Sequence, residues 1–140
     1  MSHFVVDASI AVKWFLPEIH GDAAVRLLEG DHVLVAPDLL FPEVGNVLWK
    51  RVRRREATVS EAQATLDALA SLPIEVHGSP PLMPLAFEIA CHANRSVYDS
   101  LYLAVAVLRG CRLVTADRKL YAALAGGDLS QHLMWVTDLA

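Results

Sequence analysis

The feature that most constrains the fold is a series of short apolar runs separated by segments with helical periodicity. The runs HFVVD, HVLVAP, IEVH, RLVTAD and MWV read as buried strands. Helices are predicted between them over residues 9–16, 20–29, 39–55, 59–71, 82–94 and 98–109, with a brief one ending near 125. Because strands that alternate with helices form parallel sheets covered on both faces, we expect one α/β domain over residues 1–140, with a mostly parallel five-stranded sheet.

Local signals refine this picture. Asp38 is predicted to cap the helix 39–55, and Thr58 with Glu61 makes a capping-box pattern for the helix 59–71. Cys91 and Cys111 lack the spacing of a metal site and lie in apolar stretches. We therefore expect both to be small core residues of a protein in the reducing cytoplasm.

Composition limits the class of protein. With 54% hydrophobic and 20% charged residues, the chain is expected to be a soluble, folded domain. Its first segment lacks a basic leader and is interrupted by Asp7 and Lys13, so it predicts neither a signal peptide nor a membrane span. The net charge of −4 argues against holding nucleic acid by bulk charge alone, although one local basic patch is present: Lys50, Arg51, Arg53, Arg54 and Arg55.

Two aspartates directly follow predicted strands. Asp7 ends the first run and Asp117 ends the fourth. In parallel α/β sheets, ligands bind beyond the carboxyl ends of strands, so both side chains share one crevice if these strands are neighbours. Each aspartate is equally well explained as the cap of the helix that follows it.

Two further acids lie on predicted helices. Glu43 is at the border of the apolar stripe of the helix 39–55, and Asn46 and Lys50 share its face. Asp99 opens the apolar helix SLYLAVAVL, where it suits the helix dipole. Capping or solvation explains each acid singly but not all four together.

Several carboxylates in one crevice repel each other unless a cation lies between them. Mg²⁺ or Mn²⁺ prefers such oxygen ligands, and either ion can activate water and orient a phosphodiester. The six histidines form no HxxxH or HExxH pattern, and no GxGxxG or GxxxxGK[ST] loop is present. The sequence therefore predicts a Mg²⁺ or Mn²⁺ site rather than a zinc or nucleotide site.

The segments VVDASIAVKWFLPE, APDLLFPEVGNVLWKRVRR, LPIEV, VYDSLYLAVA and LVTADRKL resemble, in order, those of a PIN domain. More narrowly, they resemble a VapC-type toxin of a toxin–antitoxin pair, over about residues 3–138. The resemblance implies a three-layer PIN-like fold and a metal-dependent ribonuclease. Its acidic motifs fall on the four acids already singled out: Asp7, Glu43, Asp99 and Asp117.

The resemblance also implies supporting roles near the metal for Ser9, Asn46 and Thr115, although local turn or cap bonding explains the two hydroxyls as well. It implies an RNA substrate such as transfer RNA, a cognate antitoxin that blocks the groove, and a homodimer. Lys50, Arg51 and Arg54 then become candidates for RNA or antitoxin contact. Some relatives carry a further acid near the last motif, whereas here Arg118 and Lys119 follow Asp117.

Three other classes of protein share parts of this sequence pattern. A haloacid-dehalogenase-type phosphatase also begins with a strand-end aspartate, but it needs a second one where this chain has Ser9. A receiver domain needs an acidic pair and a late lysine that are not found. The main alternative is a PIN-fold module that binds RNA or antitoxin with little or no nuclease activity.

Overall fold

The computed structural model describes residues 2–139. Its elements alternate along the chain as the sequence predicts, with bounds within a residue or two of those expected for most of them. In order they are β1 (Ser2–Val6), α1 (Ala8–Phe15), α2 (Gly21–Glu29), β2 (His32–Pro37), α3 (Leu40–Arg53), α4 (Val59–Ala70), β3 (Ile74–His77), α5 (Ser79–Ala93), α6 (Val97–Arg109), β4 (Arg112–Thr115), α7 (Arg118–Leu124), and β5 (Leu133–Trp135), with short 3₁₀ helices at Asp128–His132 and Val136–Asp138.

The five strands form one sheet in the order β3-β2-β1-β4-β5, and every neighbouring pair is parallel. The chain runs outward from β1 through β2 to β3, and then returns to the other side of β1 as β4. Val6 pairs in register with Val114, so the segments after β1 and β4 leave the sheet side by side. The strand order reverses here, which is where open α/β sheets bind ligands.

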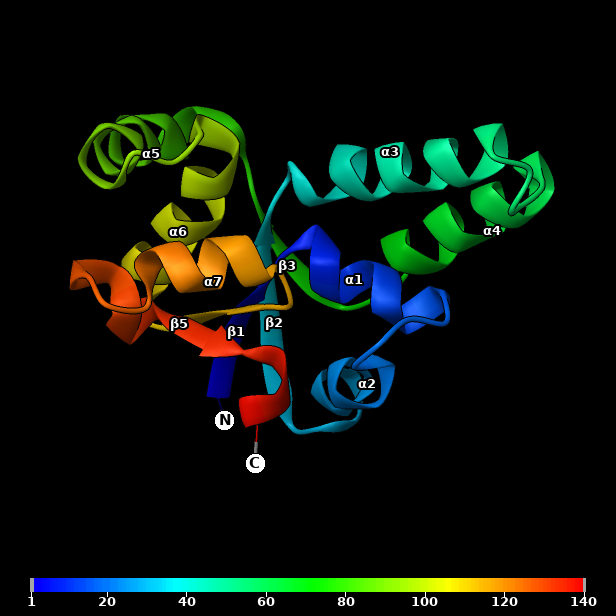
Figure 1. The fold of residues 1–140 in the computed structure, drawn as a ribbon, viewed down its shortest axis with the longest axis horizontal. Coiled ribbons are helices and arrows are strands. Elements are labelled where there is room, and N and C mark those ends of the chain that lie inside the picture. Colours follow the sequence, from blue (N-terminus) through cyan, green and yellow to red (C-terminus); the bar gives the residue numbers. More distant parts are fainter. Residues whose placement is uncertain (1, 140) are drawn as a thin grey trace.

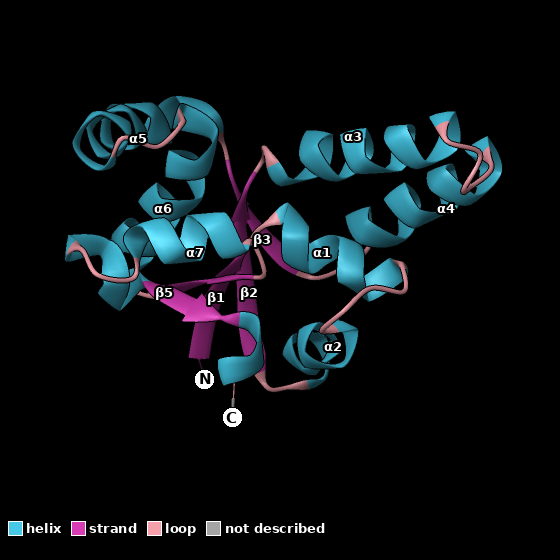
Figure 2. Ribbon diagram, viewed as in Figure 1, coloured by secondary structure: helices cyan, strands magenta, loops and turns pink. Residues whose placement is uncertain are grey.

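Helices cover both faces of the sheet and give the expected three layers (Figures 1 and 2). On one face α6 packs against β1, β2 and β4, with α5 outside it. On the other face α1 contacts β4 and α2 contacts β2. Helix α3 packs against α1 and pairs with α4, and the two extend away from the sheet (Figure 1). The α/β class and its flanking helices are therefore confirmed.

The core lies on both faces of the sheet, with α6 on one side and α1 and α2, which contribute the buried Ile10 and Leu27, on the other. Val5, Val6, Leu113 and Val114 are fully buried on the central strands, and so is Leu103 on α6. Burial on nearly all sides explains why α6 is apolar around most of its circumference. No helix among the described residues is long and apolar enough to cross a membrane.

Some local predictions need correction. Asp38 does not cap α3. Its carboxylate instead accepts hydrogen bonds from the amide (3.2 Å) and hydroxyl (2.6 Å) of Ser79, and so ties the start of α5 to the end of β2. Helix α5 begins at Ser79 rather than 82, because prolines fit the first turn, where the amide needs no helical acceptor. The capping box of Thr58 and Glu61 is confirmed.

The prediction that both cysteines are core residues is wrong for Cys91, which is exposed, while Cys111 is partly buried. Cys91 lies on α5 outside the stripe formed by its buried residues, Leu82, Ala86 and Ile89. An apolar sequence context did not reveal which face of this helix the cysteine occupies.

Candidate active site

Asp7 follows β1 and is buried, with 7% of its surface exposed. One carboxylate oxygen, Oδ1, accepts hydrogen bonds from the Ser9 hydroxyl (2.5 Å) and the Ile10 amide (3.2 Å). The other, Oδ2, accepts one from the Thr115 hydroxyl (2.6 Å) at the end of β4. Asp7 therefore caps α1, as the simpler interpretation predicted, and it also connects the two central strands.

Burial raises the pKa of Asp7 to about 6 from the usual 3.8. The hydrogen bonds from Ser9, Thr115 and Ile10 oppose this rise, and the nearby charge of Asp117 adds to it. Burial wins because hydrogen bonds replace only part of the lost hydration of a charged carboxylate. A cation that bound next to Asp7 would therefore be strongly attracted by this poorly hydrated carboxylate.

The hydroxyl groups of Ser9 and Thr115 are oriented, because each also accepts a hydrogen bond from a backbone amide. The Ala116 amide donates to Ser9 Oγ and the Asp117 amide to Thr115 Oγ1, both at 3.0 Å. With these amides as donors, each hydroxyl proton is free to point at Asp7. Ser9 and Thr115, for which the resemblance implies supporting roles near a metal, thus hold the Asp7 carboxylate through hydrogen bonds.

Asp117 is the N-cap of α7, with its Oδ1 accepting from the Leu120 amide at 3.1 Å. Asp99 lies in the first turn of α6, where its backbone amide donates a hydrogen bond to the hydroxyl oxygen of the N-cap residue Ser96 at 3.1 Å. Arg95 pairs with Asp99 Oδ2 at 3.0 Å. Both aspartates keep one oxygen outside these contacts.

Glu43 on α3 accepts a hydrogen bond from the Tyr102 hydroxyl at 2.5 Å. Partial burial raises the pKa of Glu43, the Tyr102 hydrogen bond lowers it, and the charge of Asp99 raises it further. Burial and the same carboxylate also raise the pKa of Tyr102, whose hydroxyl consequently stays protonated and donates. Tyr102 is buried and connects α6 to α3. The charges of Asp7 and Asp99 also raise the pKa of its hydroxyl.

The four predicted acids act on one another, since the charge of Asp117 raises the pKa of Asp7 and the charge of Asp99 raises that of Glu43. Among residues 2–139, no three His, Cys, Asp or Glu side chains lie close enough together to hold a metal ion by themselves. The donors nevertheless fit Mg²⁺, which commonly takes one or two carboxylates and completes its shell with water and phosphate oxygens. A set of oxygen ligands without histidine or cysteine favours Mg²⁺ or Mn²⁺ over zinc or copper.

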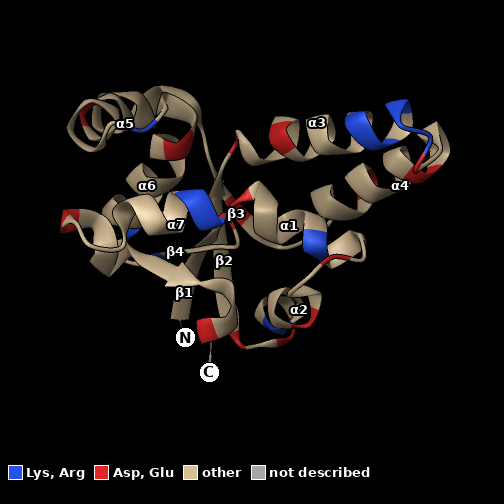
Figure 3. Ribbon diagram, viewed as in Figure 1, with Lys and Arg blue, Asp and Glu red and all other residues tan. Residues whose placement is uncertain are grey.

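A groove of about 450 Å³ lies along α3, and of the four acids Glu43 lines it. Glu43, Asn46 and Lys50 all line it, as their predicted common face requires. At the far end of α3, Lys50, Arg53 and Arg54 line a second hollow of about 230 Å³. Figure 3 shows the change from acidic to basic residues along this helix.

Of the three cations predicted to contact RNA or antitoxin, Arg51 has intramolecular partners. It pairs with Glu18 at 3.0 Å and with Glu56 at 3.5 Å. Glu18 also pairs with the buried Lys13 at 3.2 Å. Arg51 thus joins α3 to the loop after α1, whereas Lys50 and Arg54 are exposed.

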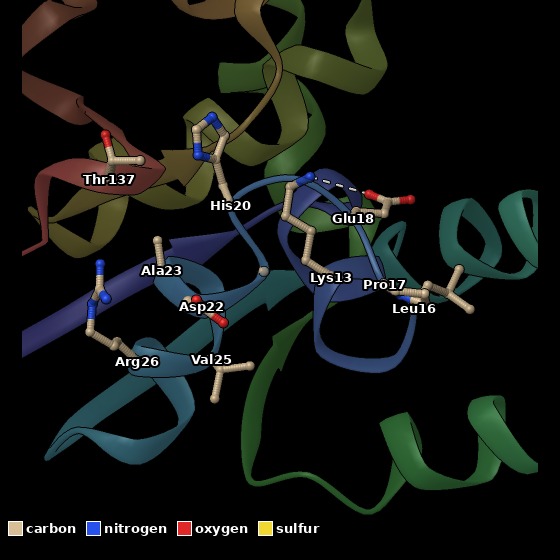
Figure 4. A pocket seen from close by; sticks show the side chains of 11 residues that line it. Lys13, Leu16, Pro17, Glu18, His20, Asp22, Ala23, Val25, Arg26 and Thr137 are labelled. Atoms are coloured by element: carbon tan, nitrogen blue, oxygen red, sulfur yellow. Dashed lines mark hydrogen bonds and ion pairs between the residues drawn. The ribbon is translucent and has the colours of Figure 1, made fainter.

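A larger hollow of about 650 Å³ lies elsewhere, beside α1 and α2 (Figure 4). Lys13, Glu18, His20 and Arg26 are among its lining residues, and none of the four acids is. Size alone would select this hollow, but its Lys13–Glu18 pair satisfies both charges. The ends of β1 and β4 are the better candidate because they hold the buried carboxylate of Asp7, which has no ion-pair partner among residues 2–139.

The sequence interpretation missed Tyr102 and Arg95. Tyr102 lies three residues after Asp99 on α6, one helical turn along the same face, and this spacing was a usable signal. Arg95 precedes Asp99 by four residues, which is the spacing of a helical ion pair, although it lies just before the helix begins.

Replacing Tyr102 with phenylalanine is expected to reduce the free energy of unfolding by about 1–2 kcal/mol at neutral pH. The ring packing is kept, but the half-buried Glu43 carboxylate loses its donor. The loss should shrink in acid, where Glu43 is protonated and no longer needs the hydrogen bond. Urea unfolding at several pH values measures this, with Tyr121→Phe, whose ring packs against Trp135, as the control. An equal loss at all pH values would contradict a bond to ionised Glu43.

Comparison with known proteins defines the class. The family model for the PIN domain matches residues 4–125. Ribonuclease VapC3 of Pyrobaculum aerophilum is 35% identical over 118 residues, which are 83% of this chain and 90% of the relative. Ribonuclease VapC1 of Mycobacterium tuberculosis is 33% identical over 125 residues, covering 88% of this chain and 92% of that one.

A solved structure agrees with this match. The crystal structure of PAE2754 from Pyrobaculum aerophilum superposes with a TM-score of 0.67 at 30% identity, covering 90% of this chain and 82% of that chain. This chain therefore belongs to the PIN-domain family. Within that family it stands with the VapC-type members, as its motifs predicted.

Proposed function

We propose that this protein is a metal-dependent endoribonuclease and the toxin of a toxin–antitoxin pair, with the crevice around Asp7 as its active site. The observation that carries the proposal is the buried Asp7 carboxylate, held by two oriented hydroxyls at the point where strand order reverses. The printed names of the relatives, which are ribonucleases, support RNA as the substrate class.

Each acid has a proposed role. Asp7 and Asp117, from the ends of β1 and β4, would hold Mg²⁺ or Mn²⁺, and Glu43 and Asp99 would bind it directly or through its waters. A bound metal would supply an activated water and charge stabilisation for the phosphodiester. The chain itself orients Asp7 through Ser9 and Thr115, orients Glu43 through Tyr102, and offers Asn46 and Lys50 to the substrate.

The decisive experiment is RNA cleavage by the purified protein with Mg²⁺, with Mn²⁺ and with EDTA. We expect cleavage with either metal and none with EDTA. Asp99→Asn and Glu43→Gln should each slow it by roughly a hundredfold or more, because each removes a ligand charge at almost unchanged volume. The matched control is Asp67→Asn, at an exposed acid on α4.

Two results would contradict the proposal. Cleavage that continues at full rate in EDTA would remove the metal from the mechanism. RNA binding without cleavage, under every metal tested, would instead favour a PIN-fold binding module.

Two protein partners belong to the same proposal. A cognate antitoxin would cover the groove along α3, and its co-expression should abolish cleavage. A second copy of this chain would cover exposed apolar residues such as Met83 and Phe87, which lie four residues apart on α5. Cleavage with and without antitoxin, and the mass in solution, test these two partners separately.

A further inference from the structure

We propose that the ring of Tyr98 is a stacking platform for an unpaired nucleobase of the RNA, next to the phosphate that is cut. This inference rests on the proposed ribonuclease function and identifies the residue on which a base of the bound RNA would stack. Its basis is the position of Tyr98, which lies directly before Asp99 at the start of α6.

Tyr98 is exposed in an unusual place. Its exposed fraction is 63%, whereas Tyr102, one turn later on the same helix, is 3% exposed. The exposed ring lines the groove that also contains Glu43, and this groove includes Ala8, the residue after Asp7. A large aromatic surface is thus open to solvent within the hollow that Glu43 also lines.

The other lining residues suit a nucleotide. Leu39, Pro42 and Val47 provide an apolar wall, and the Asn46 amide can both donate and accept hydrogen bonds at the edge of a base. Lys50 supplies a cation for a phosphate at the far end of the groove. An aromatic ring, an amide and a cation in one hollow provide a partner for the base face, the base edge and the backbone respectively.

The basic residues continue the same path. Lys50 lines both this groove and the next hollow along α3, whose other lining residues are Arg53 and Arg54. A strand with one base on Tyr98 would therefore place its following phosphates along the basic end of α3 (Figure 3). Proteins that bind single-stranded nucleic acid combine these two features, a basic track and an aromatic stacking surface.

A single strand fits these features better than a duplex. Stacking needs the face of an unpaired base, and bases in a duplex already stack on each other. The protein also carries a net charge of −4, so a short basic track with a stacking site is a better source of affinity than overall charge.

The test measures binding in EDTA, so that no cleavage is needed for the readout. The probe is a short single-stranded RNA that carries one fluorescent adenine analogue, whose emission falls when it stacks on an aromatic ring. Tyr98→Ala should weaken binding by roughly tenfold and abolish the loss of emission, while Tyr98→Phe should keep both. Leu108→Ala removes another exposed apolar side chain, at the other end of α6, and serves as the control.

Tyr98→Leu separates stacking from simple apolar contact, and it should behave like Tyr98→Ala in the emission measurement. The inference is overturned if Tyr98→Ala binds the probe as tightly as the parent, as it would if the ring served only a protein partner. It is also overturned if Tyr98→Phe loses as much as Tyr98→Ala, since the hydroxyl would then be responsible. Because the readout is independent of metal, a protein that stacks the base but never cleaves RNA would contradict the proposed activity and leave the stacking site in place.

Discussion

Asp7→Asn is expected to abolish RNA cleavage and, in the same variant, to make the metal-free protein more stable. Asparagine has nearly the same shape and keeps an oxygen for the Ile10 amide, but it carries no charge. The folded protein then avoids burying an ionised carboxylate at neutral pH. The difference between a pKa of about 6 in the fold and 3.8 in the unfolded chain corresponds to a gain of about 2–3 kcal/mol.

The pH dependence fixes the sign of this effect. Between about pH 4 and 6 the folded parent binds more protons at Asp7 than the unfolded chain does. Its free energy of unfolding should therefore fall as the pH rises through this window, relative to Asp7→Asn. Below the window both states are protonated at this position, so the variant should have no advantage there.

Urea unfolding of the parent and Asp7→Asn in EDTA, from pH 4 to 7, measures the difference directly. Mg²⁺ should reverse the ranking, because only the parent gains stability from a bound ion. A variant that is less stable than the parent at pH 7 in EDTA would mean that hydrogen bonds, rather than burial, dominate at Asp7. A variant that still cleaves RNA at the parent rate would remove Asp7 from the active site.

Thr115→Val is expected to destabilise the protein by about 1–3 kcal/mol and to slow cleavage strongly, although the two side chains have the same shape. Thr115 is fully buried and its hydroxyl has two tasks. It donates to Asp7 Oδ2 and accepts from the Asp117 amide. Valine leaves that amide without its partner and removes a donor from Asp7, whose pKa should rise further above its usual range.

The control is Thr115→Ser, which keeps the hydroxyl and loses only a methyl group. Chemical denaturation gives the stability of both variants, and cleavage rates at several pH values show whether Asp7 now requires a higher pH to ionise. Equal activity in Thr115→Val and the parent would show that Thr115 only fills space. A loss in Thr115→Ser as large as in Thr115→Val would assign the effect to the methyl group.

The fold was predictable because its main signals are local. Buried parallel strands read as continuous apolar runs, and helix faces repeat with their own period, so element order and sheet class follow from the sequence. The order in which strands pair is not a local property. That β1 lies between β2 and β4 was a condition for bringing Asp7 and Asp117 together, and the structure meets that condition.

The site was only partly predictable, for a related reason. Asp7 and Asp117 directly follow strands, so the order of strands in the sheet determines where their carboxylates lie. Glu43 shares a helix face with Asn46 and Lys50. Contacts between side chains that are distant in sequence gave no such signal. Tyr102 reaches Glu43 across 59 positions, and Arg51 pairs with Glu18 across 33. Asp38 failed as a cap because Ser79, 41 positions away, offers it two donors.

The hydrogen bond between Thr115 and Asp7 spans 108 positions of the chain. The hydrogen bonds around Asp7 are thus completed by β4, one of the last strands to be synthesised. Contacts of such long range form late, because they must overcome the entropy of closing a large loop. A nascent chain that has folded only through α6 holds Asp7, Glu43 and Asp99 but lacks Thr115 and Asp117. Under the function proposed above, the chain would consequently be unable to cleave RNA until nearly the whole domain had left the ribosome.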